Sequence, residues 1–291
     1  MRGSTRASRC PDMGTDGRAL RRFLRNPSAW LGLLVMAGVL LMAATAGLFY
    51  PGDPQGMVAK PYLWPGQDPA FPLGTDNFGR DVTAGVFHGA RVSLWIGVVS
   101  AAICLTIGTL VGAIGGYFGG WTDDLLTRLT EAVQTMPSFL FLIVLVAIFQ
   151  PTLATITLGI GLVSWPTVAR LVRAEFRRLR GQDFVLAARS LGFPHWRIIF
   201  QEILPNALPP LIVTTSVIVA SAILTESALA FLGLGDPNVL SWGMMIGNGR
   251  AVIRTAWYLS AVPGALIVLT VLAVNLLGEA LNDAANPRLG N

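Results

Sequence analysis

The chain has 291 residues, of which 53% are hydrophobic and 13% charged, with a mean hydropathy of +0.60. Soluble chains carry about 25% charged residues, so this composition argues against a water-soluble globule. The basic residues are 20 arginines and the single Lys60, which Pro61 follows, so the phosphate-binding pattern GxxxxGK[ST] is absent. Two cysteines and two histidines supply neither a disulfide framework nor a paired zinc motif. We therefore expect no ATP hydrolysis by that route, no resident cofactor or metal, and no catalytic residues in this chain.

Charge-free runs indicate the membrane-spanning segments, because about 20 apolar helical residues cross a hydrocarbon core and a charge at its centre is costly. Five runs satisfy this condition, and the third, residues 132–169, is too long for one helix. Gln150 and Pro151 divide that run into two. The sequence therefore predicts an all-α, polytopic membrane protein with six transmembrane helices. The predicted spans are 28–49, 92–118, 128–149, 152–171, 206–231 and 257–279.

The first span follows an arginine-rich segment and could be read as a signal peptide. Its apolar stretch of about 20 residues, Trp30–Phe49, exceeds the roughly 7 to 15 of a signal sequence, and no cleavage site follows before Pro51. We expect it to remain as a transmembrane helix. If the N-terminus is cytoplasmic, 16 basic residues fall in cytoplasmic segments and five in external ones. This asymmetry predicts that both termini are cytoplasmic.

The net charge of +5 follows from this placement, because a basic cytoplasmic face lies opposite anionic lipid headgroups. We therefore expect a lipid bilayer as partner and no nucleic acid. The predicted non-membrane segments are the cytoplasmic tails 1–27 and 280–291, the external segments 50–91 and 232–256, and the cytoplasmic loop 172–205.

The first external segment ends in the sequence PLGTDNFGRDVTAGVFHGARVSL. Thr75 or Asp76 could cap an interfacial helix that begins near Asn77 and leads into the second span. His88 has no second ligand nearby, so a packed or surface histidine is favoured over a metal ligand.

Glycines recur at every fourth position of the second span, at Gly108, Gly112, Gly116 and Gly120. Small residues with this spacing let another helix approach closely in lipid. We predict a tight helix seam, with packing inside the chain favoured over packing against a second subunit.

The cytoplasmic loop contains seven arginines and three acids between Arg170 and Glu202. A lipid-binding charge patch is one interpretation. Asp183–Leu191, however, predicts a short helix that Gly192 ends, and Pro194 opens a second helical stretch to Leu204 and Pro205. Two short helices with a sharp bend indicate a compact element that inserts into another protein.

The stretch VLAARSLGFPHWRIIFQEILPNAL resembles the EAA loop of ABC-importer permeases, whose pattern is EAA, three residues, Gly, nine residues and I-x-L-P. Two positions differ, since Leu186 replaces the Glu and Glu202 replaces the Ile. Further stretches resemble the C-type permease of dipeptide and oligopeptide importers, in the peptide and nickel branch. They are PLGTDNFGRDV, GARVSL, ESALAFLGLG, DPNVLSWGMMI and PGALIVLTVLAVNLLGEALNDAANPR.

This resemblance implies a type I ABC-importer permease fold in a bacterial inner membrane. It also implies a homologous second permease, two ATPase subunits that carry ATP and Mg, an external substrate-binding protein and a peptide substrate. The loop would seat on an ATPase and convert its closure into alternating access. We expect Arg189 and Arg197 to pair with acids on that partner, and a bulky residue at Gly192 to uncouple the complex. The residues assigned to the loop are Asp183, Leu186, Ala187, Ala188, Arg189, Gly192, Phe193, Arg197, Leu204 and Pro205.

Glu226 is the one acid inside the apolar stretch 203–235, and it is either a substrate or proton contact or a structural group near the break at Gly233 and Gly235. Asp236 begins the second external turn, and for both Glu226 and Asp236 a gating role and a structural role stay open. An ion-coupled secondary transporter would need more charged groups at mid-membrane. An intramembrane enzyme would need a nucleophile or metal motif that the spans lack. Nickel or glutathione import stays open as the alternative to peptide import.

Overall fold

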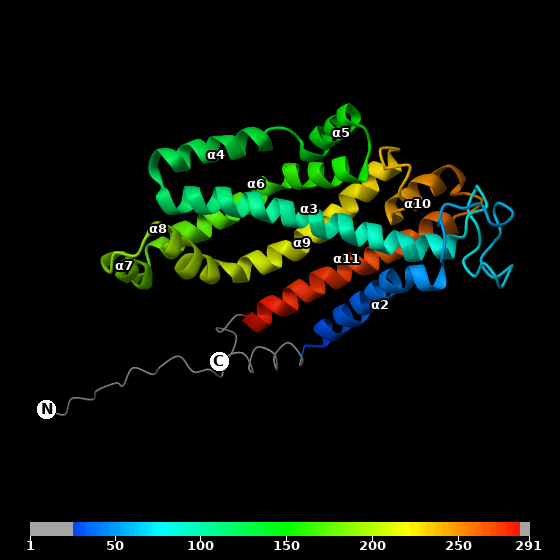
Figure 1. The fold of residues 1–291 in the computed structure, drawn as a ribbon, viewed down its shortest axis with the longest axis horizontal. Coiled ribbons are helices and arrows are strands. Elements are labelled where there is room, and N and C mark those ends of the chain that lie inside the picture. Colours follow the sequence, from blue (N-terminus) through cyan, green and yellow to red (C-terminus); the bar gives the residue numbers. More distant parts are fainter. Residues whose placement is uncertain (1–25, 286–291) are drawn as a thin grey trace, which may run out of the picture.

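The computed structural model describes residues 26–285, which form an elongated bundle of helices (Figure 1). The elements in chain order are α2 (Pro27–Phe49), α3 (Val82–Phe118), α4 (Gly120–Gln134), α5 (Ser138–Phe149), α6 (Leu153–Arg180), α7 (Asp183–Ser190), α8 (His195–Arg197), the π-helix η1 (Ile198–Ile203), α9 (Leu204–Phe231), α10 (Trp242–Gly249), the 3-10 turn η2 (Arg250–Val252) and α11 (Tyr258–Ala285). Helices α7 and α8 lie at one end of the bundle, and α10 lies with the long loop of residues 50–81 at the other (Figure 1). We call these the α7 end and the α10 end.

Five helices are long and apolar enough to cross a membrane, namely α2, α3, α6, α9 with the turns that precede it, and α11. A sixth crossing is formed if α4 and α5, which meet at a bend of 76°, count as one broken span. The predicted all-helical membrane fold is therefore confirmed for the described residues.

The predicted third span, 128–149, is wrong as a single helix. Helix α4 begins earlier, at Gly120, and ends at Gln134, and α5 begins only at Ser138. Pro137 lies between them and causes the break, because it has no N–H and forces the preceding residue out of the helical region. Charge alone could not reveal this break, since the run 132–169 has no charged residue on either side of Pro137.

The expected helix that leads into the second span is present as the start of α3, but its predicted start near Asn77 and its predicted cap, Thr75 or Asp76, are wrong. The N-cap of α3 is Asp81, whose side chain accepts a hydrogen bond from the Thr83 N–H at 2.7 Å. Asp76 instead accepts bonds from the backbone N–H groups of Phe78 and Arg80, at 2.8 and 2.9 Å, and so closes a loop. From Val82 onward, α3 runs without interruption for 37 residues.

Three of the four predicted seam glycines lie in the most extensive helix contact in the bundle, between α3 and α6. A Cβ atom at Gly108 would lie 2.5 Å from Val168 Cβ, and one at Gly112 would lie 2.5 Å from the Ala169 carbonyl oxygen. One at Gly116 would lie 2.7 Å from a carbonyl oxygen and a Cβ atom of α6. The seam is internal to the chain, as predicted.

Gly120 lies outside this seam, contrary to the prediction. Helix α3 ends at Phe118, and Gly119 and Gly120 both have positive φ angles, of 69° and 56°. The chain turns there into α4, so a Cβ atom added at the fourth glycine would meet no other atom within 4 Å. The sequence spacing continues past the end of the helix that the pattern describes.

Candidate functional site

The predicted coupling loop contains a compact turn directly after α7. The Phe193 N–H bonds to the Ala188 carbonyl at 3.1 Å, and the Gly192 N–H bonds to the Arg189 carbonyl at 2.9 Å. This pair of bonds is the Schellman ending of a helix, which requires a left-handed residue at its turn. Gly192 supplies it with a φ of 76°. Gly192 therefore ends the helix, as the sequence indicated.

The second helical stretch differs from the prediction of two separate short helices. The chain passes from α8 through η1 directly into α9, so that His195–Phe231 forms one long helical path. The observed loop also begins later than the predicted range 172–205, because α6 continues to Arg180. The bend at Gly192 thus joins α7 to the start of a transmembrane helix. A displacement of α7 would act directly on that helix.

The inner face of this loop is packed into the main hydrophobic core. Val185 and Ile198 are fully buried, Ala188 is 5% exposed, and all three belong to the same core cluster as Phe176 of α6. Core side chains at this packing density transmit displacement instead of absorbing it. The loop is therefore held as a rigid extension of α6 and α9. We call residues 183–205 the coupling knob.

Tyr117, at the end of α3, fixes the knob to the rest of the bundle. Its hydroxyl lies 2.8 Å from His195 Nδ1, and its carbonyl accepts a bond from Arg180 at 2.9 Å. The Arg189 guanidinium lies 5.1 Å from the centre of its ring. Sequence reasoning missed Tyr117, His195 and Arg180, because Tyr117 and His195 are 78 residues apart.

The outer face of the knob is apolar and exposed. Leu191 is 72% exposed and Trp196 is 60% exposed, which is unusual for such side chains outside lipid or an interface. Leu186, at the position where the EAA pattern has Glu, is 47% exposed and belongs to the same group. The exposed apolar residues of the knob are Phe184, Leu186, Leu191, Trp196 and Phe200.

The remaining predicted knob residues divide between the two faces. Ala188 is buried, while Phe193 and Leu204 are partly buried. The Arg197 guanidinium stacks 4.0 Å from the centre of the Phe193 ring and donates to Gln201 at 3.1 Å. The exposed members of the predicted set are Asp183, Leu186, Ala187, Arg189, Gly192, Arg197 and Pro205. Arg189 and Arg197 therefore each combine an internal aromatic contact with an exposed position.

Glu226 lies far from the knob, near the α10 end, and is 2% exposed. Its Oε1 accepts a bond of 2.5 Å from the Ser241 hydroxyl, and that hydroxyl also caps α10 by accepting from the Met244 N–H. The backbone N–H of Trp242 bonds to Ser93 of α3 at 3.1 Å. Glu226 thus joins α9 to α10, which supports its structural interpretation.

Asp236 is also engaged within the fold. Its Oδ2 accepts from the Leu153 N–H at 2.7 Å, at the first turn of α6, and its Oδ1 accepts from the Asn238 N–H at 2.9 Å. A carboxylate at a helix N-terminus satisfies an otherwise unpaired N–H and complements the helix dipole. Asp236 therefore connects the loop after α9 to the start of α6.

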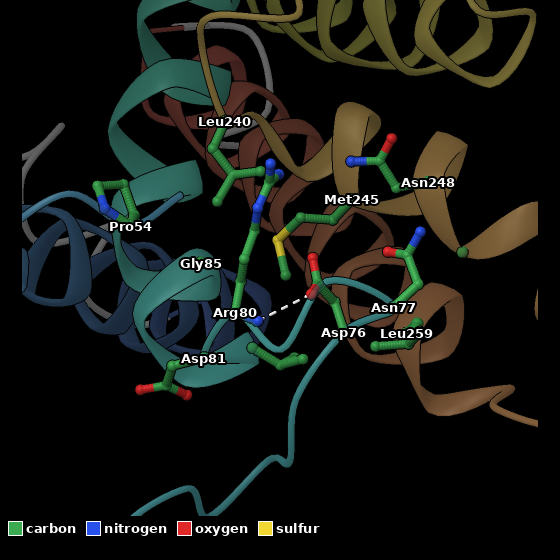
Figure 2. Close-up of a pocket in the computed structure, with 12 residues that line it drawn as sticks. Pro54, Asp76, Asn77, Arg80, Asp81, Gly85, Leu240, Met245, Asn248 and Leu259 are labelled. Atoms are coloured by element: carbon green, nitrogen blue, oxygen red, sulfur yellow. Dashed lines mark hydrogen bonds between the residues drawn. The ribbon is translucent and has the colours of Figure 1, made fainter. Parts of the chain in front are cut away.

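At the α10 end, a pocket lies between the start of α3, α10 and the loop of residues 50–81. Figure 2 shows Arg80 on one side of Met245 and Asn77 and Asn248 on the other, with Asp76 between Arg80 and Asn77. The dashed line marks the bond from the Arg80 backbone N–H to the Asp76 carboxylate. The TDNFGRD sequence thus shapes the α10 end of the bundle.

Comparison with known families gives two matches. The model for the binding-protein-dependent transport system inner membrane component matches residues 108–291. The model for the N-terminal transmembrane domain of oligopeptide transport permease C matches residues 17–69. Together they cover most of the chain.

Three relatives illustrate the sequence similarity. The dipeptide transport system permease protein DppC of Haemophilus influenzae is 36% identical over 92% of each chain. The di/tripeptide transport system permease protein DppC of Pseudomonas aeruginosa is 38% identical over 92% of this chain and 91% of its own. The oligopeptide transport system permease protein OppC of Bacillus subtilis is 36% identical over 93% of this chain and 89% of its own.

Solved structures resemble the fold at lower identity. The inward-facing MetNI methionine ABC transporter matches 69% of this chain and 96% of the matched chain, with a TM-score of 0.58 and 17% identity. An amino acid ABC transporter solved with histidines matches 66% of this chain and 89% of its own, with a TM-score of 0.51 and 14% identity. These likenesses show an ABC-transporter permease fold.

Proposed function

Because the chain belongs to the family of binding-protein-dependent transport system inner membrane components, we propose that it is a permease subunit that imports di- and oligopeptides by alternating access. It works with a homologous second permease, two ATPase subunits and an external substrate-binding protein. ATP and Mg bind to the ATPase subunits, and this chain does no chemistry. It resides in a bacterial inner membrane with both termini in the cytoplasm.

The observation that carries this proposal is the two-sided structure of the coupling knob. Its inner face is buried with the core of α3 and α6, and its outer face presents exposed apolar side chains. An apolar patch with arginines at its rim fits a partner groove with an apolar floor and acidic edges. The ATPase subunit is the partner in this proposal.

Coupling then follows from the connectivity of the knob. ATP-driven closure of the ATPase pair moves α7, and the bend at Gly192 passes that movement to the path that starts at His195. Since α9 belongs to this path, the movement reaches the membrane region. Alternation between inward-open and outward-open states is the expected consequence.

The peptide assignment is supported by the relatives, whose names describe dipeptide, di/tripeptide and oligopeptide transport. Uptake of radiolabelled dialanine, a pentapeptide, glutathione and nickel should be measured in cells with and without this chain. Loss of peptide uptake, restored by the intact chain, is the expected result. Unchanged peptide uptake with lost nickel or glutathione uptake would replace peptide by that substrate.

A further inference from the structure

A second polar pocket lies between α3, α4 and α6, in the half of the bundle nearer the α7 end. Its cavity volume is about 130 Å³, several times the roughly 30 Å³ that one water molecule occupies in the liquid, so it has room for a small polar group. Gly112 and Gly115 of α3 form part of its wall. Neither the coupling knob nor the contacts of Glu226 involve this pocket.

Two opposite charges line the pocket from different helices. Glu131 comes from α4 and Arg170 from α6, and both side chains are exposed to the open space. Within residues 26–285, neither side chain forms a hydrogen bond or ion pair with another residue. By contrast, Arg173 is occupied, since its NH2 group donates to the buried Asp123 at 2.8 Å. In the part of the chain that the structure describes, the pocket thus offers a cation and an anion without a hydrogen-bond or ion-pair partner, and Glu131 lies near enough to Arg173 to interact with its charge.

A third group points to a polar ligand. The Thr127 hydroxyl is buried and has no hydrogen-bond partner among the described residues, while Thr130 next to it bonds to the Leu126 carbonyl at 2.7 Å. Buried hydroxyls in folded proteins are normally paired, so an orphan beside an open pocket indicates a missing partner. Gln134 adds an amide to the same wall.

The backbone next to the pocket is interrupted. Gln134 is the last residue of α4, and the chain bends by 76° before α5. Non-helical backbone at membrane depth is tolerated where it is buried in protein or lines a water-filled cavity. Discontinuous helices also form substrate sites in other transporters.

We propose that this pocket is a binding site for the zwitterionic ends of a peptide on the cytoplasmic half of the transport path. Arg170 pairs with the peptide carboxylate and Glu131 with the peptide ammonium. Thr127 and Gln134 bond to the peptide amide between them. The proposal rests on the proposed function, because it takes the transported peptide as the ligand.

The test measures equilibrium binding of radiolabelled dialanine to the assembled complex in lipid nanodiscs, without the external binding protein. Two competitors remove one charge each, dialanine amide the carboxylate and N-acetyl-dialanine the ammonium. Each is expected to bind the unmodified complex at least about tenfold more weakly than dialanine, the scale of a charge-assisted hydrogen bond.

The variants identify which side chain reads which charge. Arg170→Gln is expected to bind dialanine about tenfold more weakly and to show no further loss with the amide, as a double-mutant cycle requires. Glu131→Gln is expected to behave in the same way toward N-acetyl-dialanine. Arg170→Lys should keep most of the binding. Arg128→Gln and Asp124→Asn are matched controls, because both residues are exposed on α4 outside the pocket.

The outcomes separate the alternatives. Saturable binding with these charge-specific losses supports the site, whereas no saturable binding, or equal binding by variants and controls, overturns it. Lipid binding is measured in nanodiscs that contain phosphatidylethanolamine and, as a comparison, in nanodiscs of phosphatidylglycerol. If the variants bind less phosphatidylethanolamine but bind dialanine normally, the pocket is a lipid headgroup site and the proposal is overturned. If cells that contain the unmodified chain take up no peptide, the proposed function is refuted. If those cells take up peptide normally but the variants bind dialanine as tightly as the unmodified complex, only the proposal for this pocket is refuted.

Discussion

Gly192 allows a direct test of how the coupling knob works, because its backbone conformation favours glycine while the space around it would accept a side chain. Its φ of 76° lies in the left-handed region, yet an added Cβ would meet no atom within 4 Å. Within this chain, Gly192 is therefore required for its conformation and not for lack of space. Substitutions that differ in conformational preference and in size should separate the two effects.

The magnitude follows from the backbone. An ordinary residue in the left-handed region costs about 1–2 kcal/mol, whereas Asn visits it more readily. A cost of this size lowers the population of the bent conformation by a factor of about 5–30. We expect Gly192→Asn to couple nearly as well as the native chain, Gly192→Ala to couple less well, and Gly192→Val to couple worst.

The assay is the amount of dialanine imported per ATP hydrolysed in proteoliposomes that contain the full complex. Gly181→Ala is the matched control, since Gly181 ends α6 with a φ of −88° and also has open space around it. Its coupling should be unchanged. If Gly192→Ala couples normally while Gly192→Asn fails, size at the partner interface is the controlling factor and the conformational argument is refuted.

Three further predictions concern the bundle itself, each measured as the melting temperature of the purified complex. Gly112→Ala places a methyl group 2.5 Å from a backbone oxygen, and overpacking of about 1–3 kcal/mol at about 2–4 °C per kcal/mol lowers the melting temperature by several degrees. Gly38→Ala, with nothing within 4 Å, should not lower it, and equal effects of the two variants would contradict the seam. Glu226→Ala removes a buried hydrogen bond and should cost about 1–3 kcal/mol, while Glu226→Gln should retain transport; a transport-dead, stable Glu226→Gln would favour a direct functional role. Asp236→Ala removes the acceptor for the Leu153 N–H and should cost about 0.5–2 kcal/mol; an unchanged melting temperature would refute its capping role.

The charge-free runs located the membrane-spanning helices well. Each run gives the length of the apolar part of a helix, however, and not the length of the whole helix. The predicted span 28–49 differs by one residue from α2, Pro27–Phe49. The second and fourth spans were too short, because α3 begins at Val82 and α6 continues to Arg180. The added start of α3 packs on α10, and the added end of α6 packs on α3 at Gly112 and Gly116. Charged residues such as Arg173 are compatible with a helix outside the hydrocarbon core. A count of apolar residues cannot detect that extension.

The candidate site was predicted in part for a similar reason. The Gly192 bend follows from local chemistry, because a left-handed turn at a helix end favours glycine. The contacts of Tyr117 with His195, and of Arg170 and Glu131 with a shared pocket, depend on how distant helices meet. Sequence spacing carries no information about such contacts. Gly120 shows the converse error, because the four-residue glycine repeat continues in the sequence after α3 has ended at Phe118.

The central claim is that the coupling knob transmits the ATP-driven movement of the ATPase subunits to the transmembrane helices. Dialanine uptake and ATP hydrolysis should be measured together in proteoliposomes that contain the native complex or the Trp196→Asp variant, which places a charge on the exposed apolar face. We predict that the native complex imports dialanine with ATP and that the variant folds but loses ATP-driven uptake. Unimpaired uptake by the variant would contradict the claim.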